Sequence, residues 1–215
     1  MQPLVFLLRR RAVDLVAVSA AATLRDALGL GERLRALRRD DGYCLENLQE
    51  GSQEEWLRAC VHRSSWFNPN THRHALFVAA PGAHAAARQE GSWPEPWLGS
   101  LLGSDRPELA EPPSCDHLEA WLSLPRERDS YSVSLLAFDG EEPVRTLPRG
   151  YWPDAQGQVL AFQLWTLLLA APTADAALEL ALEVSLARSR DRGLLIHPQR
   201  ERWALAAPVA ASLEE

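Results

Sequence analysis

The stretch that most constrains how this chain folds occurs twice. Residues 66–77 read WFNPNTHRHALF and residues 195–206 read LIHPQRERWALA. Each stretch follows an amphipathic helical pattern and precedes a short strand pattern. Aligned, the two share Pro69 with Pro198, Arg73 with Arg202, Ala75 with Ala204 and Leu76 with Leu205. The sequence therefore predicts a degenerate tandem repeat, with chance similarity as the alternative.

The proline in each stretch predicts a corner between a helix and a strand. Pro69 ends the preceding helix and biases Asn68 toward an extended backbone. We expect Asn70 to satisfy nearby backbone groups through an Asx turn. His197 and Pro198 are expected to build the same corner in the second stretch.

Residues 1–80 alternate between strand and helix patterns. An apolar run at 3–10 predicts a strand, and Asp14 precedes an alanine-rich helix. Two short runs flank the Asp-Gly pair at 41–42, which predicts a hairpin. Ser52 and Glu55 form a capping box that opens a second helix, and the corner leads into a last strand. This strand-helix-strand-strand-helix-strand order is that of a ferredoxin-like fold.

The remainder predicts a linker and a second, degenerate half. Residues 81–113 are rich in proline, which is typical of a linker or extended arm. Residues 114–215 then carry strand patterns and a helix that Thr173 caps. We therefore predict an α+β protein of two ferredoxin-like halves, 1–80 and 114–215. Each half would have an antiparallel sheet with helices on one face.

Composition excludes several classes of function. All 22 basic residues are arginine, so lysine-dependent Schiff-base and P-loop chemistry is excluded. The net charge of −7 disfavours binding to nucleic acid. Three cysteines without paired spacing predict reduced thiols and a cytoplasmic protein. The apolar run at the start of the sequence is too short to span a bilayer, so we expect no membrane association.

Two histidines form the main metal-site candidate in the sequence, since Cys115-Asp116-His117 is more simply explained by Asp116 as a helix cap. His72 and His74 alternate along a predicted strand and so share one face of it. No spacing in the chain matches a zinc motif, which favours a structural role for both histidines. A metal-dependent enzyme on this pair is the least favoured hypothesis, and no cofactor is expected.

Arginines are the candidate ligand-binding groups. The two corners share Arg73 and Arg202, and a basic strip contains Arg33, Arg35 and Arg38. These side chains suit a small anionic ligand, as in a regulatory module of the ACT-like kind. The sequence lacks a nucleophile elbow and a phosphate loop, so a non-enzymatic role is favoured over catalysis.

Residues 1–80 resemble the small PurS-type subunit of bacterial formylglycinamide ribonucleotide amidotransferase. The similarity lies in the order of elements, in LLRRRAVD leading to Asp14, and in the Asn-Pro of WFNPNTHRHALF. The Pro-Gly and Asp-Pro-Gln-Gly motifs of that family are absent. The resemblance implies an accessory or assembly subunit that bridges larger catalytic subunits. Our leading hypothesis is therefore a non-enzymatic protein that binds a protein partner or forms oligomers.

Overall fold

The computed structural model describes residues 3–49, 51–62, 65–78, 88–90, 129–139, 145–146, 157–189, 192–196, 201–205 and 208–210. The α-helices of this part are α1 (Leu15–Ala22), α2 (Gln53–His62) and α5 (Ala174–Leu186). A short π-helix η1 (Thr23–Ala27) and a short 3₁₀ helix η2 (Gly31–Arg33) follow α1. The strands are β1 (Leu4–Arg10), β2 (Leu34–Glu46), β3 (His72–Val78), β4 (Arg88–Glu90), β5 (Ser130–Asp139), β6 (Arg145–Thr146), β7 (Gln158–Ala170), β8 (Arg188–Ser189), β9 (Arg192–Gly193), β10 (Glu201–Leu205) and β11 (Val209–Ala210).

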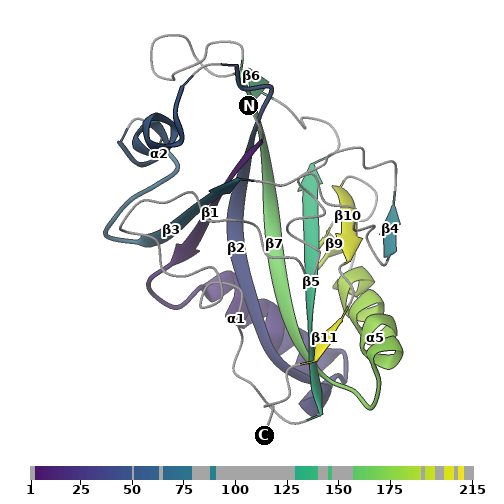
Figure 1. Cartoon of the computed structure of the whole chain (residues 1–215). Coiled ribbons are helices and arrows are strands. Elements are labelled where there is room, and N and C mark those ends of the chain that lie inside the picture. The colour runs from purple at the N-terminus through teal and green to yellow at the C-terminus, as the bar shows by residue number, and fades with distance from the viewer. Residues whose placement is uncertain are drawn as a thin grey trace, which may run out of the picture.

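One antiparallel sheet organises the described part of the chain. Its strands follow the order β3-β1-β2-β7-β5-β10-β4, with β11 added to β5 and β6 added to β7 (Figure 1). The two long strands, β2 and β7, pair from Leu34 with Leu169 to Glu46 with Gln158. Strands from residues 1–80 and from residues 114–215 therefore meet along β2 and β7 in the middle of one sheet. The predicted α+β class and antiparallel pairing are confirmed.

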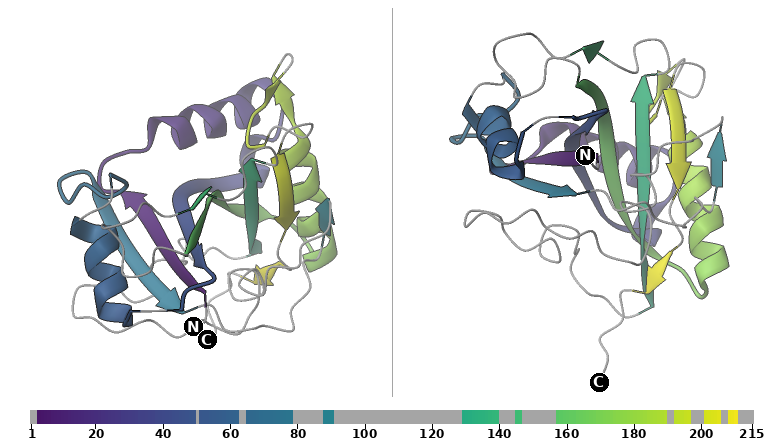
Figure 2. Two further views of the ribbon diagram at one scale, coloured as in Figure 1. Left: turned by 90° about the horizontal axis from the view of Figure 1, so that it is seen from above. Right: turned by 45° about the horizontal axis from the view of Figure 1, so that its top comes forward.

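The three helices pack on the same face of this sheet, over two separate apolar clusters. At one end α2 contributes Trp56 to a cluster that contains Phe6 and Leu76. At the other end α1 and α5 cover a cluster around Trp165 and Leu167. The views in Figure 2 show α2 and α5 at opposite ends of the sheet.

The opposite face of the sheet is also apolar. Leu7 on β1, Cys44 on β2, Leu164 on β7 and Leu136 on β5 are each 0% exposed, and their side chains alternate with those under the helices. Burial of both faces explains why β1 and β7 are nearly continuous apolar runs instead of alternating ones.

The predicted hairpin at Asp41 and Gly42 is wrong, because β2 runs unbroken through both residues. Gly42 lies opposite Phe162 on β7, and a Cβ added to it would be 2.2 Å from two atoms of that ring. The glycine is therefore needed for the close approach of an aromatic side chain, and not for a turn. The expectation rested on local turn chemistry, whereas packing against β7 decides the conformation here.

The predicted capping box at Ser52 and Glu55 and the predicted cap at Thr173 are confirmed. Glu55 accepts a hydrogen bond from the Ser52 backbone N–H at 2.7 Å, and the Glu55 N–H donates to the Ser52 hydroxyl at 3.3 Å. Thr173 accepts from the Ala176 N–H at 3.2 Å. Asp14 accepts from the Val16 N–H and starts α1. These local interactions position the start of each helix relative to the preceding strand.

The pairing register relates the strands of the two ends of the sheet. β1 pairs with both β2 and β3, and β5 pairs in the same way with both β7 and β10. Arg9 lies opposite Arg73, and Phe138 lies opposite Arg202. Phe138 follows Arg9 in the sequence by the same number of residues as Arg202 follows Arg73. A single sequence offset therefore relates the pair Arg9–Arg73 to the pair Phe138–Arg202.

Candidate functional site

Two arginines converge on one buried carboxylate on the sheet face opposite the helices. The Asp40 side chain is 0% exposed. Arg9 on β1 donates to it twice, from Nε to Oδ1 at 2.8 Å and from Nη2 to Oδ2 at 2.9 Å. Arg38 Nε lies 3.7 Å from Asp40 Oδ2. We refer to Arg9, Arg38 and Asp40 as the arginine cluster.

Strand periodicity explains why these residues meet. Arg38 and Asp40 are two residues apart on β2 and so share a face, and Arg9 comes from the neighbouring strand β1. On the other side Arg38 Nη2 donates to the Thr166 hydroxyl of β7 at 3.4 Å. Thr166 in turn lies opposite Ser134 of β5. Polar side chains thus form a row across four adjacent strands of an otherwise apolar face.

In the arginine cluster, Arg9 and Arg38 lie close to each other and to the same carboxylate. Burial and the neighbouring Arg9 lower the pKa of Arg38 to about 10, and the attraction of Asp40 only partly opposes these effects. Arg38 therefore stays protonated at neutral pH. The side chains of Arg9 and Arg38 are 20% and 16% exposed, and the Nε atom of Arg38 is buried.

The structure separates the five arginines predicted to bind a ligand. Arg38 belongs to the arginine cluster, and exposed Arg73 lies beside it, opposite Arg9 on β3. Arg202 lies on β10, with its guanidinium carbon 4.3 Å from the centre of the Phe138 ring. Arg35 occupies a β-bulge at the start of β2 and pairs with exposed Glu32 at 2.8 Å.

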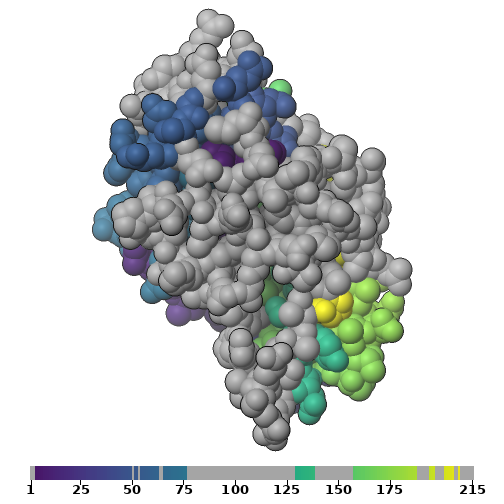
Figure 3. All heavy atoms as spheres, in the orientation of Figure 1, coloured from purple at the N-terminus to yellow at the C-terminus, as the bar shows by residue number. Residues whose placement is uncertain are grey.

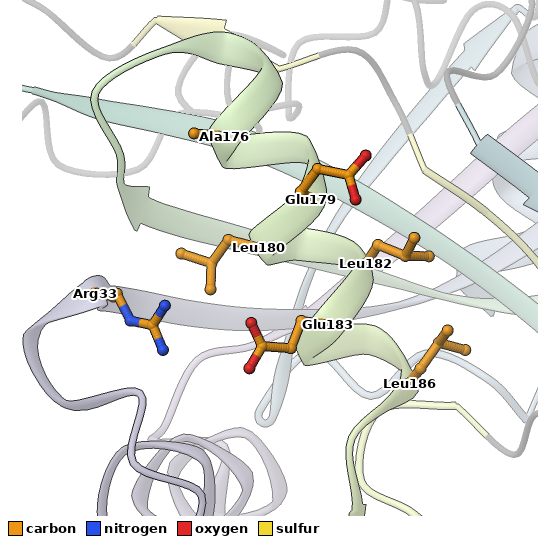
Figure 4. Close-up of a pocket in the computed structure, with 7 residues that line it drawn as sticks. All are labelled: Arg33, Ala176, Glu179, Leu180, Leu182, Glu183 and Leu186. Atoms are coloured by element: carbon orange, nitrogen blue, oxygen red, sulfur yellow. The ribbon is translucent and has the colours of Figure 1, made fainter.

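Arg33, the fifth, lines an open pocket between η2 and α5. The pocket has a volume of about 600 Å³, and its other lining residues are Ala176, Glu179, Leu180, Leu182, Glu183 and Leu186. In Figure 4 the Arg33 guanidinium and the Glu183 carboxylate extend toward the same space from opposite sides. Carboxylates on its wall make this pocket a poor place for an anion.

The sequence interpretation missed Arg9 and Asp40. Arg9 lies near the end of the strand predicted at 3–10, and Asp40 directly precedes the Asp-Gly pair that predicts a hairpin. The available signal was the alternation of Arg38 and Asp40, which places opposite charges on one face of a strand. Finding their partner requires the pairing of β1 with β2, across 31 residues of sequence.

An apolar surface on α1 is the second candidate site. Val13, Leu15, Val16 and Val18 are 70%, 76%, 49% and 52% exposed, and we refer to these four residues as the α1 surface. The opposite side of the helix, including Ala17 and Ala20, is buried against the sheet. A group of neighbouring aliphatic side chains this exposed often marks a site of interaction, whereas single exposed apolar residues do not.

Arg10 and Arg11 bound the α1 surface at its N-terminal end, and both are exposed. The nearby Asp14 carboxylate is paired with Arg39, at 3.0 Å from its Nε. Asp26 lies beyond the far end of α1 and is exposed. The N-terminal rim of the α1 surface is therefore basic.

The Asn-Pro-Asn corner contains an Asx turn, but its acceptor is the Asn68 side chain and not the expected Asn70 side chain. The Asn68 side chain accepts from the Asn70 N–H at 2.9 Å, and the Asn68 carbonyl accepts from the His72 N–H at 2.8 Å. Arg11 stabilises the corner, because its Nε atom donates to the carbonyl oxygens of Pro69 and His72, both at 3.0 Å. His197 and Pro198 lie outside the described residues.

The two candidate metal ligands lie in different surroundings. The His72 Nδ1 atom accepts from the Asn68 N–H at 3.3 Å. The His74 ring packs 4.8 Å from the centre of the Phe67 ring and 5.8 Å from that of Phe6. Among the described residues, no three His, Cys, Asp or Glu side chains gather in a way that would hold a metal ion.

Comparisons with known proteins give no relative for this chain. No protein-family model matches the sequence, and no match was found among curated proteins or solved structures. Within the described part of the chain, no helix has the length and apolar character needed to cross a membrane.

Proposed function

We propose that this protein is a non-enzymatic accessory or assembly subunit that binds a larger protein through the α1 surface. The observation that carries the proposal is the exposure of Val13, Leu15, Val16 and Val18, between 49% and 76%. The helix packs on the sheet through its alanine side. Leu15, Val16 and Val18 on its outer side, and Val13 just before it, are exposed and have no role in the fold itself. A protein partner provides that role.

The proposed partner is a different protein with an apolar groove and acidic groups near one end of it. Leu15 and Val18 are three residues apart and so project from the same side of α1, as anchors of a helix in a groove do. Arg10 and Arg11 would meet the acidic groups. Covering these side chains would contribute on the order of 5 kcal/mol before the entropy of association is subtracted. The apolar contact alone is therefore weak, and charge complementarity adds to it.

We further propose that the chain contains two related halves, 1–80 and 114–215, of a modified ferredoxin-like kind in which the unbroken β2 takes the place of the predicted hairpin. The support is the single offset along the chain that relates β1 to β5 and β3 to β10, and that also aligns Pro69 with Pro198 in the two corner sequences. In addition, α2 follows β2 and α5 follows β7, and these two strands pair at the centre of the sheet. The two helices cover opposite ends of the same face of the sheet. A sheet shared by two halves in one chain is also what the resemblance to PurS-type subunits would imply for a fused pair.

The first experiment is affinity capture from native extract with the full chain. The test variant carries Leu15→Asp and Val18→Asp. The matched control carries Leu186→Asp on α5, and Leu186 is 38% exposed. Leu186 belongs to α5, whose atoms lie at the surface in Figure 3, so the control adds the same charge to an exposed leucine outside the α1 surface.

The captured protein is then purified, and its affinity is measured by calorimetry. We expect binding to the wild type and the Leu186→Asp variant, and a loss of at least tenfold in affinity, or about 1.4 kcal/mol, in the double variant. Equal binding by all three would contradict the proposal. So would a wild type that self-associates through α1, or one that binds anionic lipid vesicles but no protein.

A further inference from the structure

The pocket between η2 and α5 has one wall from a helix and one from a turn. Ala176, Glu179, Leu180 and Glu183 follow one another at intervals of three or four residues, so they lie along one side of α5. Arg33, the last residue of η2, lines the pocket from the other side (Figure 4). Its volume of about 600 Å³ lies in the range of sites that hold small molecules.

The core beneath the pocket fixes its two walls. Leu30 and Leu34, on either side of η2, are buried in the same apolar cluster as Leu180 of α5. The Arg33 backbone N–H donates to the Leu30 carbonyl oxygen at 2.9 Å, which closes the turn. The backbone that carries Arg33 and the helix that carries Glu183 are therefore held in place by shared packing. The pocket does not depend on an exposed loop for its shape.

Opposite charges face each other across the pocket without pairing. The Arg33 guanidinium and the Glu183 carboxylate point into the same space (Figure 4), and both side chains are exposed. Within the part of the chain that the structure describes, neither side chain forms an ion pair or a hydrogen bond. By contrast, exposed Arg35 closes on Glu32 at 2.8 Å, two residues from Arg33. The space between Arg33 and Glu183 can therefore be bridged by a molecule that carries both signs of charge.

The same pocket offers an aliphatic surface beside the two charges. Leu180, Leu182 and Leu186 line it, and Leu186 is 38% exposed. A purely anionic ligand would meet the carboxylates of Glu179 and Glu183, and a purely cationic ligand would meet Arg33. A zwitterion with an apolar portion matches all three kinds of lining group.

We propose that this pocket binds a free α-amino acid with an aliphatic side chain. The ligand carboxylate accepts paired, charge-assisted hydrogen bonds from the Arg33 guanidinium, and the ligand ammonium group donates to the Glu183 carboxylate. The aliphatic side chain packs on the leucines of α5. One exposed ion pair adds little to binding, so the ligand needs both charges and its apolar portion.

The test is scanning calorimetry of the full chain with L-leucine and with two analogues that each lack one charge. Isoamylamine keeps the amine and the side chain of leucine, and isocaproate keeps the carboxylate and the side chain. Sodium chloride holds the ionic strength constant. We expect a saturable rise in Tm with leucine and no comparable rise with either analogue at the same concentration. No saturable rise with leucine, or an equal rise with one analogue, would overturn the proposal.

Variants then assign the binding to the two charged side chains. Arg33→Gln and Glu183→Gln should each weaken the apparent affinity for leucine by about tenfold or more. Both residues are exposed, so these changes leave the core packing intact. The matched control is Asp175→Asn, which removes an exposed carboxylate of the same helix outside the pocket and should leave the affinity unchanged. Equal affinity in all three variants would overturn the proposal.

This inference stands apart from the proposed protein partner. None of the residues that line the pocket belongs to the α1 surface. Failure of the leucine experiments therefore leaves the capture experiment unaffected.

Discussion

Gly42→Ala tests whether close packing between β2 and β7 specifies the centre of the sheet. Gly42 lies opposite Phe162, and the added methyl carbon would be 2.2 Å from ring atoms Cε2 and Cζ and 2.7 Å from Cε1. Carbon atoms in contact are about 3.5–4.0 Å apart, so the ring has to move by more than about 1 Å. Phe162 is only 4% exposed, and its neighbours on this face are buried too.

The expected penalty is that of overpacking a core, about 1–3 kcal/mol. For a chain of 215 residues, each kcal/mol lowers Tm by about 2–4 °C, so a penalty of about 1–3 kcal/mol should lower Tm by about 2–12 °C. Differential scanning calorimetry measures the change in Tm, and urea denaturation measures the free energy of unfolding.

Phe162→Leu provides the matched background, because it removes the ring that the new methyl group meets. The double variant Gly42→Ala and Phe162→Leu should be more stable than the two single effects predict, by about 1 kcal/mol or more. A Gly42→Ala protein within about 1 °C of the wild-type Tm would refute the reasoning, as would an equal penalty of Gly42→Ala in both backgrounds.

Three further predictions concern single side chains. Asp40→Asn removes the carboxylate between two arginines and should reduce the free energy of unfolding by roughly 2–4 kcal/mol, since solvent partly screens Arg9. Arg35→Gln, which breaks an exposed pair with Glu32, should change it by less than about 0.5 kcal/mol in the same urea titration. Thr173→Ala removes the acceptor for the Ala176 N–H and should cost about 1 kcal/mol, measured as a lower urea midpoint. Burial and Arg10 lower the pKa of His72, so the folded state favours the neutral ring, and stability present above a pH of about 6.5 should fall as the pH falls through the folded pKa. His72→Asn should lose less stability than the wild type between pH 7.5 and pH 5; identical pH profiles would contradict this assignment.

Features that depend on neighbouring residues were predictable from the sequence. The capping box at Ser52 and Glu55 and the cap at Thr173 use groups within three residues of each other, and both were predicted correctly. The strands β1, β5 and β7 follow from runs of apolar residues that bury both faces. At the corner the motif was right, but the side chain that accepts the hydrogen bond belongs to Asn68 and not to Asn70.

Features that depend on distant residues were not predictable. Asp41 and Gly42 have the chemistry of a turn, and only the Phe162 ring on β7 explains why this glycine continues a strand. Asp40 likewise acquires its role from Arg9 on another strand. The α1 surface was not predicted, because the alanines and valines of α1 fit a fully buried helix equally well. The sequence does not state which side of the helix faces the sheet.

The most direct test of the proposed function is photo-crosslinking from α1. A photoreactive phenylalanine analogue at Leu15, 76% exposed, is compared with the same analogue at Leu186, 38% exposed, in the full chain within native extract. We expect one heterologous protein to be cross-linked from position 15 and not from position 186. No product from position 15, or the same products from both positions, would contradict a partner bound at the α1 surface.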